Sequence, residues 1–396
     1  MLQTPSPPRL VTLVILSGLA ALSLNIFLPS LPGMARHFDA PYAQMQIAVS
    51  GYLAVSALAQ LLIGPISDRF GRRPVQLAVL AIFVLASAAI LVAPTAETFL
   101  AARMVQSAIA TSFVLTRAMV RDMHPGPEAA SMIGYVTMGM SVVPMIGPVI
   151  GGALDEAFGW RANFAMLAAF GLATLILAWV DLGETLRGPG LGFREQLRSY
   201  PILLKSHRFW GYTLAAAFAS GSFFAYLGGA PFVGAQIYHL SAAQVGYFFA
   251  LPALGYAVGN FISGRYATRL GMDWMILAGT LTATLALAAA LGAELTGLAS
   301  AYTFFPAVGL IGLGNGLALP SANAGMMSVR PELAGTASGL GGTLTIGGGA
   351  ALSALAGTLL GPGATALPLI VLMLVSAALS VASLLWVRAR RRRLGV

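Results

Sequence analysis

The chain has 396 residues, of which 58% are hydrophobic and only 9% are charged, and its formal net charge is +9. A soluble domain carries about a quarter charged residues, so this composition excludes a water-soluble protein and predicts an all-α membrane protein with many spans. The apolar runs are continuous and close to the length of a spanning helix, which excludes the short alternating segments of a β-barrel. Cysteine is absent and the four histidines are scattered, so we expect no disulfide, no thiol nucleophile and no metal site.

The apolar runs predict twelve spans. The first run, Leu10–Leu28, follows Arg9 and is longer than the apolar core of a signal peptide, so we interpret it as a span. We expect Pro29 and Pro32 to end its helix and Leu31–Tyr42 to form an outer loop. The other spans are expected at residues 43–63, 74–93, 98–118, 130–152, 163–181, 209–229, 243–263, 274–293, 300–320, 334–358 and 365–387.

The longest polar stretch, Gly183–Arg208, divides the chain in the middle. We predict a cytoplasmic linker at residues 183–208 between an N-terminal six-helix half, residues 1–182, and a C-terminal six-helix half, residues 209–396. Part of the linker, residues 193–205, is expected to form a short helix at the membrane surface.

The positive charges predict which face is cytoplasmic. In the twelve-span arrangement all but three of the 22 Lys and Arg residues fall at or near the inner face. Arg36 and Arg161 are outside, and Arg103 is within the fourth span. The positive-inside rule therefore predicts that both termini and the linker are cytoplasmic, in a bacterial-type inner membrane. The basic charge then faces anionic lipid headgroups, so no nucleic-acid partner is expected.

One charged stretch interrupts the apolar pattern between the second and third spans. Four charges fall within Asp68–Arg73, and membrane segments exclude such a cluster, so we expect Gly64–Arg73 to be a tight inner loop. Gly64 and Gly71 allow a sharp reversal and close backbone approach.

A second copy of this stretch lies 200 residues later. Gly264–Gly271 repeats the glycine and arginine spacing, with Thr268 in the position of Asp68. An internal repeat of this period indicates two homologous halves, as in transporters built from repeats.

Gly64-x-x-x-Asp68-Arg69-x-Gly71-Arg72-Arg73 resembles the signature loop between helices 2 and 3 of the major facilitator superfamily. The resemblance implies twelve transmembrane helices in two pseudo-symmetric six-helix halves, which rock about a midplane site. It also implies a conformational latch, in which the Asp68 carboxylate meets the positive N-terminus of span 11. The implied latch residues are Gly64, Asp68, Arg69, Gly71, Arg72 and Arg73.

Two motifs inside the spans extend the resemblance. Arg103-x-x-Gln106 resembles the family's polar motif in span 4, although Ser107 stands where the family has glycine. An arginine that snorkels to the outer surface is the alternative. The span-5 pattern resembles the motif of superfamily antiporters, with ordinary small-residue packing as the alternative. Its residues are Pro144, Gly147, Pro148, Gly151 and Gly152.

Three other stretches resemble the drug-resistance branch of the family, typified by bicyclomycin and chloramphenicol exporters. They are Leu28–Pro32, Ala334–Ser338 and the inner end of span 4 with Arg117, Arg121 and Asp122.

The resemblance also implies which spans line a central cavity. Aromatic and methionine side chains there offer an adaptable apolar surface for lipophilic ligands, whereas packing or lipid contact is the alternative for each one. The candidate substrate residues are Asn25, Tyr52, Arg103, Phe113, Met138, Phe223, Phe224, Tyr226, Tyr256 and Asn315.

The chain departs from the branch at Asn25, where its members usually hold an Asp that is a favoured proton carrier. No acidic residue lies mid-span, so the sequence leaves the route of proton coupling open, with Asp122 as one candidate. Counted along their helices, Asn25 and Arg103 lie at the same depth, roughly 22 Å from the inner face. We therefore expect Asn25 to offer Arg103 a neutral hydrogen bond.

These patterns predict a secondary transporter, not an enzyme, that exports amphipathic drug-like molecules by alternating access. It is expected to act as a monomer, without cofactors, with the proton gradient as driving force. One alternative is an exporter or carrier of an organic anion or metabolite that uses an unpaired Arg103. An intramembrane enzyme is a distant alternative, because the chain lacks cysteine, a mid-span acid pair and clustered histidines.

Overall fold

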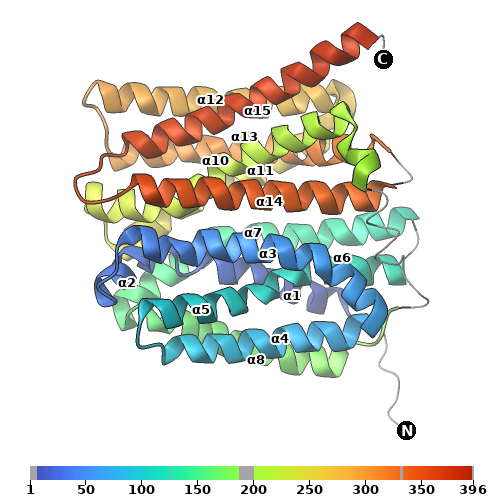
Figure 1. The fold of residues 1–396 in the computed structure, drawn as a ribbon, viewed down its shortest axis with the longest axis horizontal. Helices are drawn as coiled ribbons and strands as arrows, with labels where there is room; N and C mark the ends of the chain where they lie inside the picture. Colours follow the sequence, from blue (N-terminus) through green and yellow to red (C-terminus); the bar gives the residue numbers. More distant parts are fainter. Residues whose placement is uncertain (1–6, 125, 187–199, 331–332, 395–396) are drawn as a thin grey trace.

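The computed structural model describes residues 7–124, 126–186, 200–330 and 333–394. Its long helices run side by side, and both termini lie at one end of the bundle, here called the inner end (Figure 1). The first half comprises α1 (Leu10–Asn25), η1 (Leu28–Ser30), α2 (Leu31–His37), α3 (Tyr42–Phe70), α4 (Arg72–Leu91), α5 (Ala96–Gln106), η2 (Ser107–Thr111), α6 (Ser112–Met123), α7 (Gly126–Phe158) and α8 (Arg161–Asp181). The second half comprises α10 (His207–Phe232), η3 (Val233–Ile237), α11 (Ala242–Leu270), α12 (Met272–Leu295), α13 (Ala301–Met327), α14 (Ala334–Leu359) and α15 (Leu367–Leu394).

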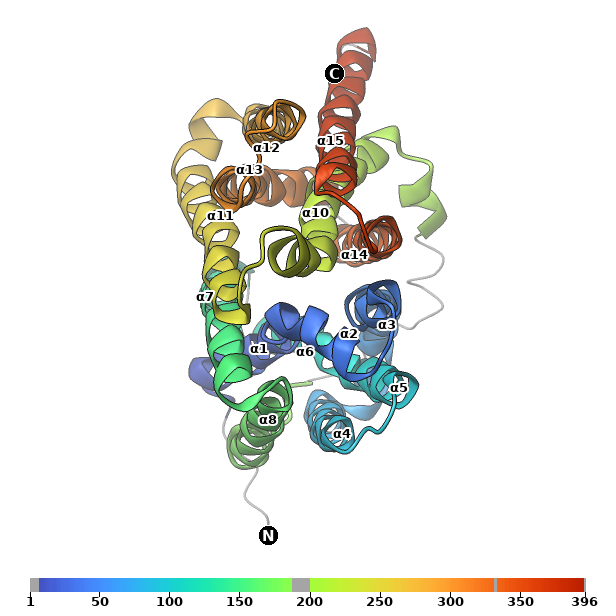
Figure 2. The same ribbon diagram turned by 90° about the vertical axis from the view of Figure 1, so that its left-hand side faces the viewer.

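The helices have the lengths that a membrane requires. Within the described residues, eleven helical segments are long and apolar enough to cross a bilayer. The 33-residue α7, whose side chains are described only in part, is the twelfth long helix. In the view from the outer end, the helices of the first half and those of the second half form two bundles (Figure 2). The predicted all-α architecture of twelve helices is confirmed.

The first span is longer than expected, because its prolines do not end it. The chain passes from α1 through η1 and into α2, which ends at His37. Pro29 and Pro32 occupy the first turns of η1 and α2, where a missing backbone N–H removes no intrahelical bond. The expectation of an outer loop at Leu31–Tyr42 is therefore wrong, since only residues 38–41 separate α2 from α3.

The stretch expected to form a tight loop is mostly helical. α3 continues through Gly64 and Asp68 to Phe70 and α4 starts at Arg72, so Gly71 alone makes the turn, with φ +94°. Gly64 has no neighbouring atom within 4 Å of the position of a Cβ, so it provides neither the reversal nor a close approach. A helix satisfies its own backbone groups at the membrane boundary, whereas a loop leaves them unpaired.

The repeat in the sequence is also a repeat of the backbone. α3 and α11 each have 29 residues, and each ends at a glycine, Gly71 or Gly271, with positive φ and nearly the same ψ of 151° or 153°. The next helix starts directly afterwards in both halves. The expected surface helix at residues 193–205 lies partly outside the described residues, and residues 200–204 are helical.

The two halves meet along two helix pairs, α7 with α11 and α3 with α14 (Figure 2). Glycines bring the first pair together. A Cβ on Gly152 would lie 2.4 Å from the carbonyl oxygen of Ala242, and one on Gly246 would lie 2.3 Å from that of Pro148. Because lipid is as apolar as the helix surface, close packing of this kind is what holds spanning helices together.

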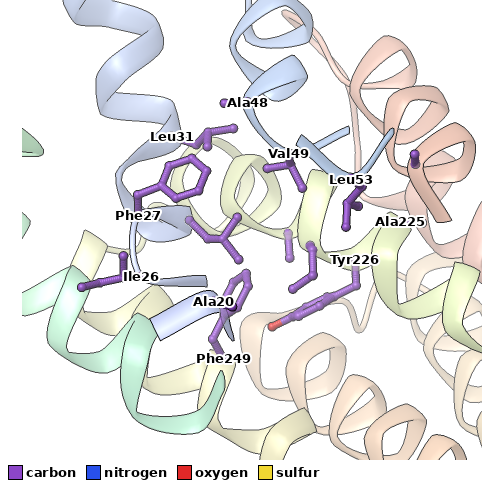
Figure 3. Packing of buried hydrophobic residues seen from close by; sticks show 14 of the residues in the cluster. Ala20, Ile26, Phe27, Leu31, Ala48, Val49, Leu53, Ala225, Tyr226 and Phe249 are labelled. Carbon is purple, nitrogen blue, oxygen red and sulfur yellow. The ribbon is translucent and has the colours of Figure 1, made fainter. Parts of the chain in front are cut away.

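An apolar cluster joins the halves toward the outer end (Figure 3). Ile26 and Phe27 follow α1, and Leu53 belongs to α3; Tyr226 of α10 and Phe249 of α11 come from the second half. All five side chains are buried. The rings of Tyr226 and Phe249 are 4.8 Å apart between centroids. Contact between the halves is thus apolar at its centre.

We predict that Gly152→Ala destabilises the purified protein by about 1–3 kcal/mol, because its methyl group meets the α11 backbone rather than a movable side chain. The measurement is the thermal midpoint in detergent. Gly342→Ala is the matched control, since nothing lies within 4 Å of its Cβ position, and it should be neutral or stabilising. Equal midpoints for both variants would contradict the close contact of α7 with α11.

Candidate transport site

Arg103 is buried completely at the centre of the first half. Its Nε donates to the carbonyl oxygen of Ala48 at 3.3 Å, and its Nη2 donates to that of Ser23 at 2.7 Å. Its Nη1 donates to the Ser23 hydroxyl at 3.2 Å and to the side-chain oxygen of Gln106. These contacts involve α1, α3 and α5, so the guanidinium links three helices.

Two aromatic rings complete the surroundings of Arg103. Its guanidinium carbon lies 4.4 Å from the ring centre of Phe27 and 4.2 Å from that of Tyr52. A desolvated arginine on an aromatic face gains up to about 2 kcal/mol. Gln106 extends the network to α4 by donating to the Ser87 hydroxyl at 2.7 Å. The arginine therefore holds the first half together without a carboxylate partner in the described part of the chain.

This geometry corrects two expectations about Arg103. The side chain does not snorkel outward, and it is not an unpaired cation in the cavity, because its donors are occupied and no surface is exposed. The expected hydrogen bond with Asn25 is wrong as well, since the Asn25 amide donates to the Ala21 carbonyl at 2.7 Å. Ser23 takes the place at Arg103 instead. Residues two apart on a helix point to different faces, so equal depth did not imply contact.

The other predicted cavity residues differ in burial. Phe113, Phe223, Phe224 and Tyr256 are partly exposed, whereas Tyr52 and Asn315 are buried. The side chain of Met138 lies outside the described residues. Tyr226 is fully buried, and its hydroxyl has no hydrogen-bond partner among the described residues.

Aromatic rings gather around Tyr226. The Phe223 ring stacks at 6.1 Å, and Phe304 and Phe305 lie within 6.5 Å. Phe249, Phe304 and Phe305 were not predicted, although the adjacent pair Phe304–Phe305 near the start of span 10 was a signal in the sequence. The second half therefore holds a packed aromatic cluster, at whose edge Phe223 is partly exposed, while the first half holds a closed polar network.

The latch residues lie at the inner end. Asp68 and Arg72 form an ion pair at 2.5 Å, and Arg72 also pairs with Asp122 at 3.0 Å. The side chain of Thr185 donates to Asp122 at 3.3 Å. The structure thus brings together Asp68, Arg72 and Asp122, which belong to two separate motifs in the sequence.

Glu184 lies beside the expected latch residues and was not predicted. Its carboxylate accepts the backbone N–H groups of Arg72 at 3.0 Å and Arg73 at 3.3 Å, at the positive end of α4. Gly71 is required here for its positive φ, and a Cβ at this position would also displace the Glu184 carboxylate, which would lie 2.4 Å away. Arg73 also donates to the carbonyl of Trp179, and Arg69 lies over the ring of Phe70. In this conformation the partner of Asp68 is Arg72, not α14.

The hydrogen bonds that the described residues form between the halves are all near the outer end. Gln46 of α3 donates to the Ser353 carbonyl at 2.6 Å and its hydroxyl at 2.8 Å. The Tyr42 hydroxyl donates to the Gly228 carbonyl at 2.7 Å. The structure is therefore closed at its outer end.

Glu156 supplies the remaining outer contact. It lies beyond the apolar part of α7 and accepts the backbone N–H of Ala243 at 3.1 Å, in the first turn of α11. Hydrogen bonds from Ser241 and Ala243 hold the pKa of the Glu156 carboxyl below its usual range. A carboxylate from one half thus caps a helix of the other.

The antiporter-like motif of span 5 has a clear structural role. Pro144 and Pro148 lie inside a continuous α7. A Cβ on Gly147 would meet Leu22 of α1, and one on Gly151 would overlap the backbone of Ile26. Gly152, also in α7, lies against Ala242 of α11. These glycines together let α7 pack against both halves at once.

Arg117 and Arg121 lie one turn apart on the face of α6 that points toward the second half. Both are exposed, they interact with each other electrostatically, and Arg117 also interacts with Tyr256 of α11. A Cβ on Gly335 of α14 would lie 3.7 Å from Arg121. Neither arginine forms an ion pair within the described residues.

Comparisons with known proteins establish the class. The chain matches the family model described as Major Facilitator Superfamily over residues 13–354 and again over 235–395. It is 30% identical over 394 residues to the MFS-type transporter YdgK of Bacillus subtilis (strain 168), with 95% of each chain covered. It is 32% identical to a chloramphenicol resistance protein of Pseudomonas aeruginosa, covering 80% of this chain and 76% of that protein.

A solved structure shares the fold. The chain resembles a bacterial homologue of the human lysosomal transporter Spinster in an inward-facing, occupied conformation, with a TM-score of 0.72 and 18% identity. The similarity covers 96% of this chain and 94% of that chain. The protein belongs to the major facilitator superfamily and is a membrane transporter rather than an enzyme.

We predict that Arg103→Lys lowers the stability of the folded protein by about 2–4 kcal/mol, since lysine cannot keep the hydrogen bonds and both ring contacts. Thermal midpoints of the purified variants measure this effect. Arg265→Lys, at an exposed site on α11, is the control and should change stability by less than about 0.5 kcal/mol. A similar small change at Arg103 would show that the network does not support the fold.

We also predict that Glu156→Gln opens the outer end. A charge at a helix terminus contributes about 0.3–1 kcal/mol, so the ratio of open to closed protein should rise about two- to fivefold. The chain has no native cysteine, so spin labels at Val92→Cys and Leu298→Cys, both highly exposed, report the outer distance between the halves.

Glu97→Gln is the control, because this outer carboxylate accepts from Gln44 of its own half. The ionised form of Glu156 favours closure, so closure should persist above the usual glutamate pKa of about 4.3 and weaken as the pH falls below it. An unchanged distance distribution in Glu156→Gln would contradict the role of this contact.

Proposed function

We propose that this transporter exports drug-like amphipathic small molecules by alternating access, as a monomer driven by the proton gradient and without a cofactor. The observation that carries the proposal is that the two helical bundles, within the described residues, form their mutual hydrogen bonds at the outer end alone. In the predicted orientation, the end without these hydrogen bonds faces the cytoplasm, and separation of the bundles there would admit substrate. The relationship to a chloramphenicol resistance protein supports drug-like substrates.

The side chains of the second half suit such substrates. Phe223 and Phe224 are partly exposed beside Tyr226, whose hydroxyl is unpaired among the described residues. An adaptable aromatic surface binds amphipathic molecules of varied shape. In this proposal, Arg103 organises the first half and does not contact the substrate.

The inner latch then controls the conformational exchange. Asp68, Arg72, Asp122 and Glu184 fix the turn between α3 and α4 in the present state. When the halves close at the inner end, Asp68 would approach the N-terminus of α14, as in the implied family latch. Asn25 has no titratable proton, so proton coupling would need another group, with Asp122 as the candidate that the sequence offers.

Efflux assays test the function. Expression in a host that lacks its own drug pumps should raise resistance to chloramphenicol and other amphipathic compounds, and a proton uncoupler should abolish the drug gradient. Protein present in the membrane without any change in resistance or accumulation across a broad panel would overturn the proposal. Persistence of the gradient with the uncoupler would remove proton coupling alone.

Asp68→Asn is predicted to reduce efflux strongly, because the amide loses the ion pair with Arg72 and the attraction to a helix N-terminus. A shift of about 1 kcal/mol changes a balanced two-state equilibrium about fivefold. Drug accumulation, normalised to membrane expression, is the measurement. Thr268→Ala, in the second copy of the motif, should be much milder, and normal efflux by Asp68→Asn would disprove the latch.

Arg117 and Arg121 favour a second candidate, the transport of organic anions. Like charges one turn apart repel, and an anionic substrate would neutralise them. If this candidate is right, anionic compounds should compete with transport, and the Arg117→Gln/Arg121→Gln variant should lose that competition while neutral drugs are still exported. The unpaired Arg103 expected for such a carrier is not available in this conformation.

A further inference from the structure

A basic cavity lies at the inner end of the second half, away from the transport site. Its volume is about 450 Å³, and it is lined from three segments: the residues leading into α10, the connection after α13, and the end of α15. Lys205, Arg208, Arg330 and Arg390 contribute the positive charge. No Asp or Glu lines this cavity within the described part of the chain.

The cavity offers several groups that favour an anion. The Arg208 Nε is buried and has no hydrogen-bond partner among the described residues. The cavity also includes Ser206 and His207, at the start of the 26-residue α10, where unpaired backbone N–H groups and the helix dipole favour negative charge. Lys205 is exposed and contributes a third source of positive potential.

One wall of the cavity is apolar and lies at the inner end of α15, where the membrane boundary is expected. Trp386 and Ile202 line it and are 42% and 51% exposed. The Trp386 ring packs edge-on against His207, with centroids 5.8 Å apart. Tryptophan is typical of membrane interfaces, where its apolar ring lies beside lipid headgroups. A soluble anion needs no such wall, whereas a lipid uses it for its glycerol and upper acyl chains.

From this combination we propose that the cavity binds the phosphate headgroup of an anionic phospholipid from the cytoplasmic leaflet. Arg208 and Arg390 receive the phosphate, as guanidinium groups bind its oxygens in pairs. Trp386 and Ile202 contact the apolar part of the lipid. The bound lipid connects α10, α13 and α15, and this role is independent of which substrate the transporter carries.

Native mass spectrometry and thermal unfolding of the full-length protein test the proposal. Phosphatidylglycerol should bind and raise the thermal midpoint, whereas phosphatidylcholine should do neither. Each basic group near an anionic lipid contributes roughly a fivefold factor, so Arg208→Gln/Arg390→Gln should bind phosphatidylglycerol roughly 25-fold more weakly. Trp386→Ala, which keeps all the charges, should also weaken binding.

Arg265→Gln/Arg269→Gln is the matched control, because it removes two exposed inner-face arginines that do not line the cavity. This pair should retain the affinity of the native protein.

Equal weakening in both double variants, or equal binding of the two lipids, would overturn the proposal. Inorganic phosphate and glycerol phosphate form the last arm: if they stabilise the protein as much as the lipid does, the site takes a soluble anion instead. Normal midpoints of the lipid-free variants confirm that they are folded.

Discussion

The close approach of the two halves at the outer end is the contact on which the rest of the structure depends. In a bilayer, apolar surface is not driven together by water, so the halves need close packing and a few polar contacts. Glycines in α7 and α11 allow the backbones to touch, and Gln46, Tyr42 and Glu156 add the hydrogen bonds. Each such bond contributes only about 0.5–1.5 kcal/mol net. The closed state is therefore specific in geometry but weak enough to be reversed.

A reversible contact between halves requires that each half moves as a unit. In the first half, Arg103 provides this unity by linking α1, α3 and α5 through its hydrogen bonds, while Gln106 reaches α4. Burial of a guanidinium without a carboxylate is expensive unless its donors are satisfied, and here each of its three nitrogens donates at least one hydrogen bond. In the second half, Tyr226 of α10 packs against Phe249 of α11 and Phe304 of α13, so aromatic contacts link these helices. One half is thus held by a polar centre and the other by an apolar centre.

The sequence predicted what depends on composition and local pattern. The twelve-helix architecture followed from hydropathy, and the turn at Gly71 followed from a glycine between charged residues. The exact helix ends did not, because Pro29 and Pro32 are harmless in a first turn and the charges after Gly64 are compatible with a helix. Contacts between distant residues were harder still. The depth of a residue along its helix can be counted from the sequence, but the rotation of the helix about its axis cannot. Asn25 was therefore expected to contact Arg103, whereas Ser23 makes the contact. Glu156 and Glu184 carried no local signal for the helix termini that they cap.

Alternating access is the central claim, and distance measurements at both ends of the protein test it most directly. In the cysteine-free chain, spin-label pairs would be placed at Val92 and Leu298 for the outer end and at Phe70 and Leu270 for the inner end. On addition of a transported drug under a proton gradient, the outer distance should increase in the same fraction of molecules in which the inner distance decreases. Distances that stay constant during transport, or that change in the same direction at both ends, would contradict the account.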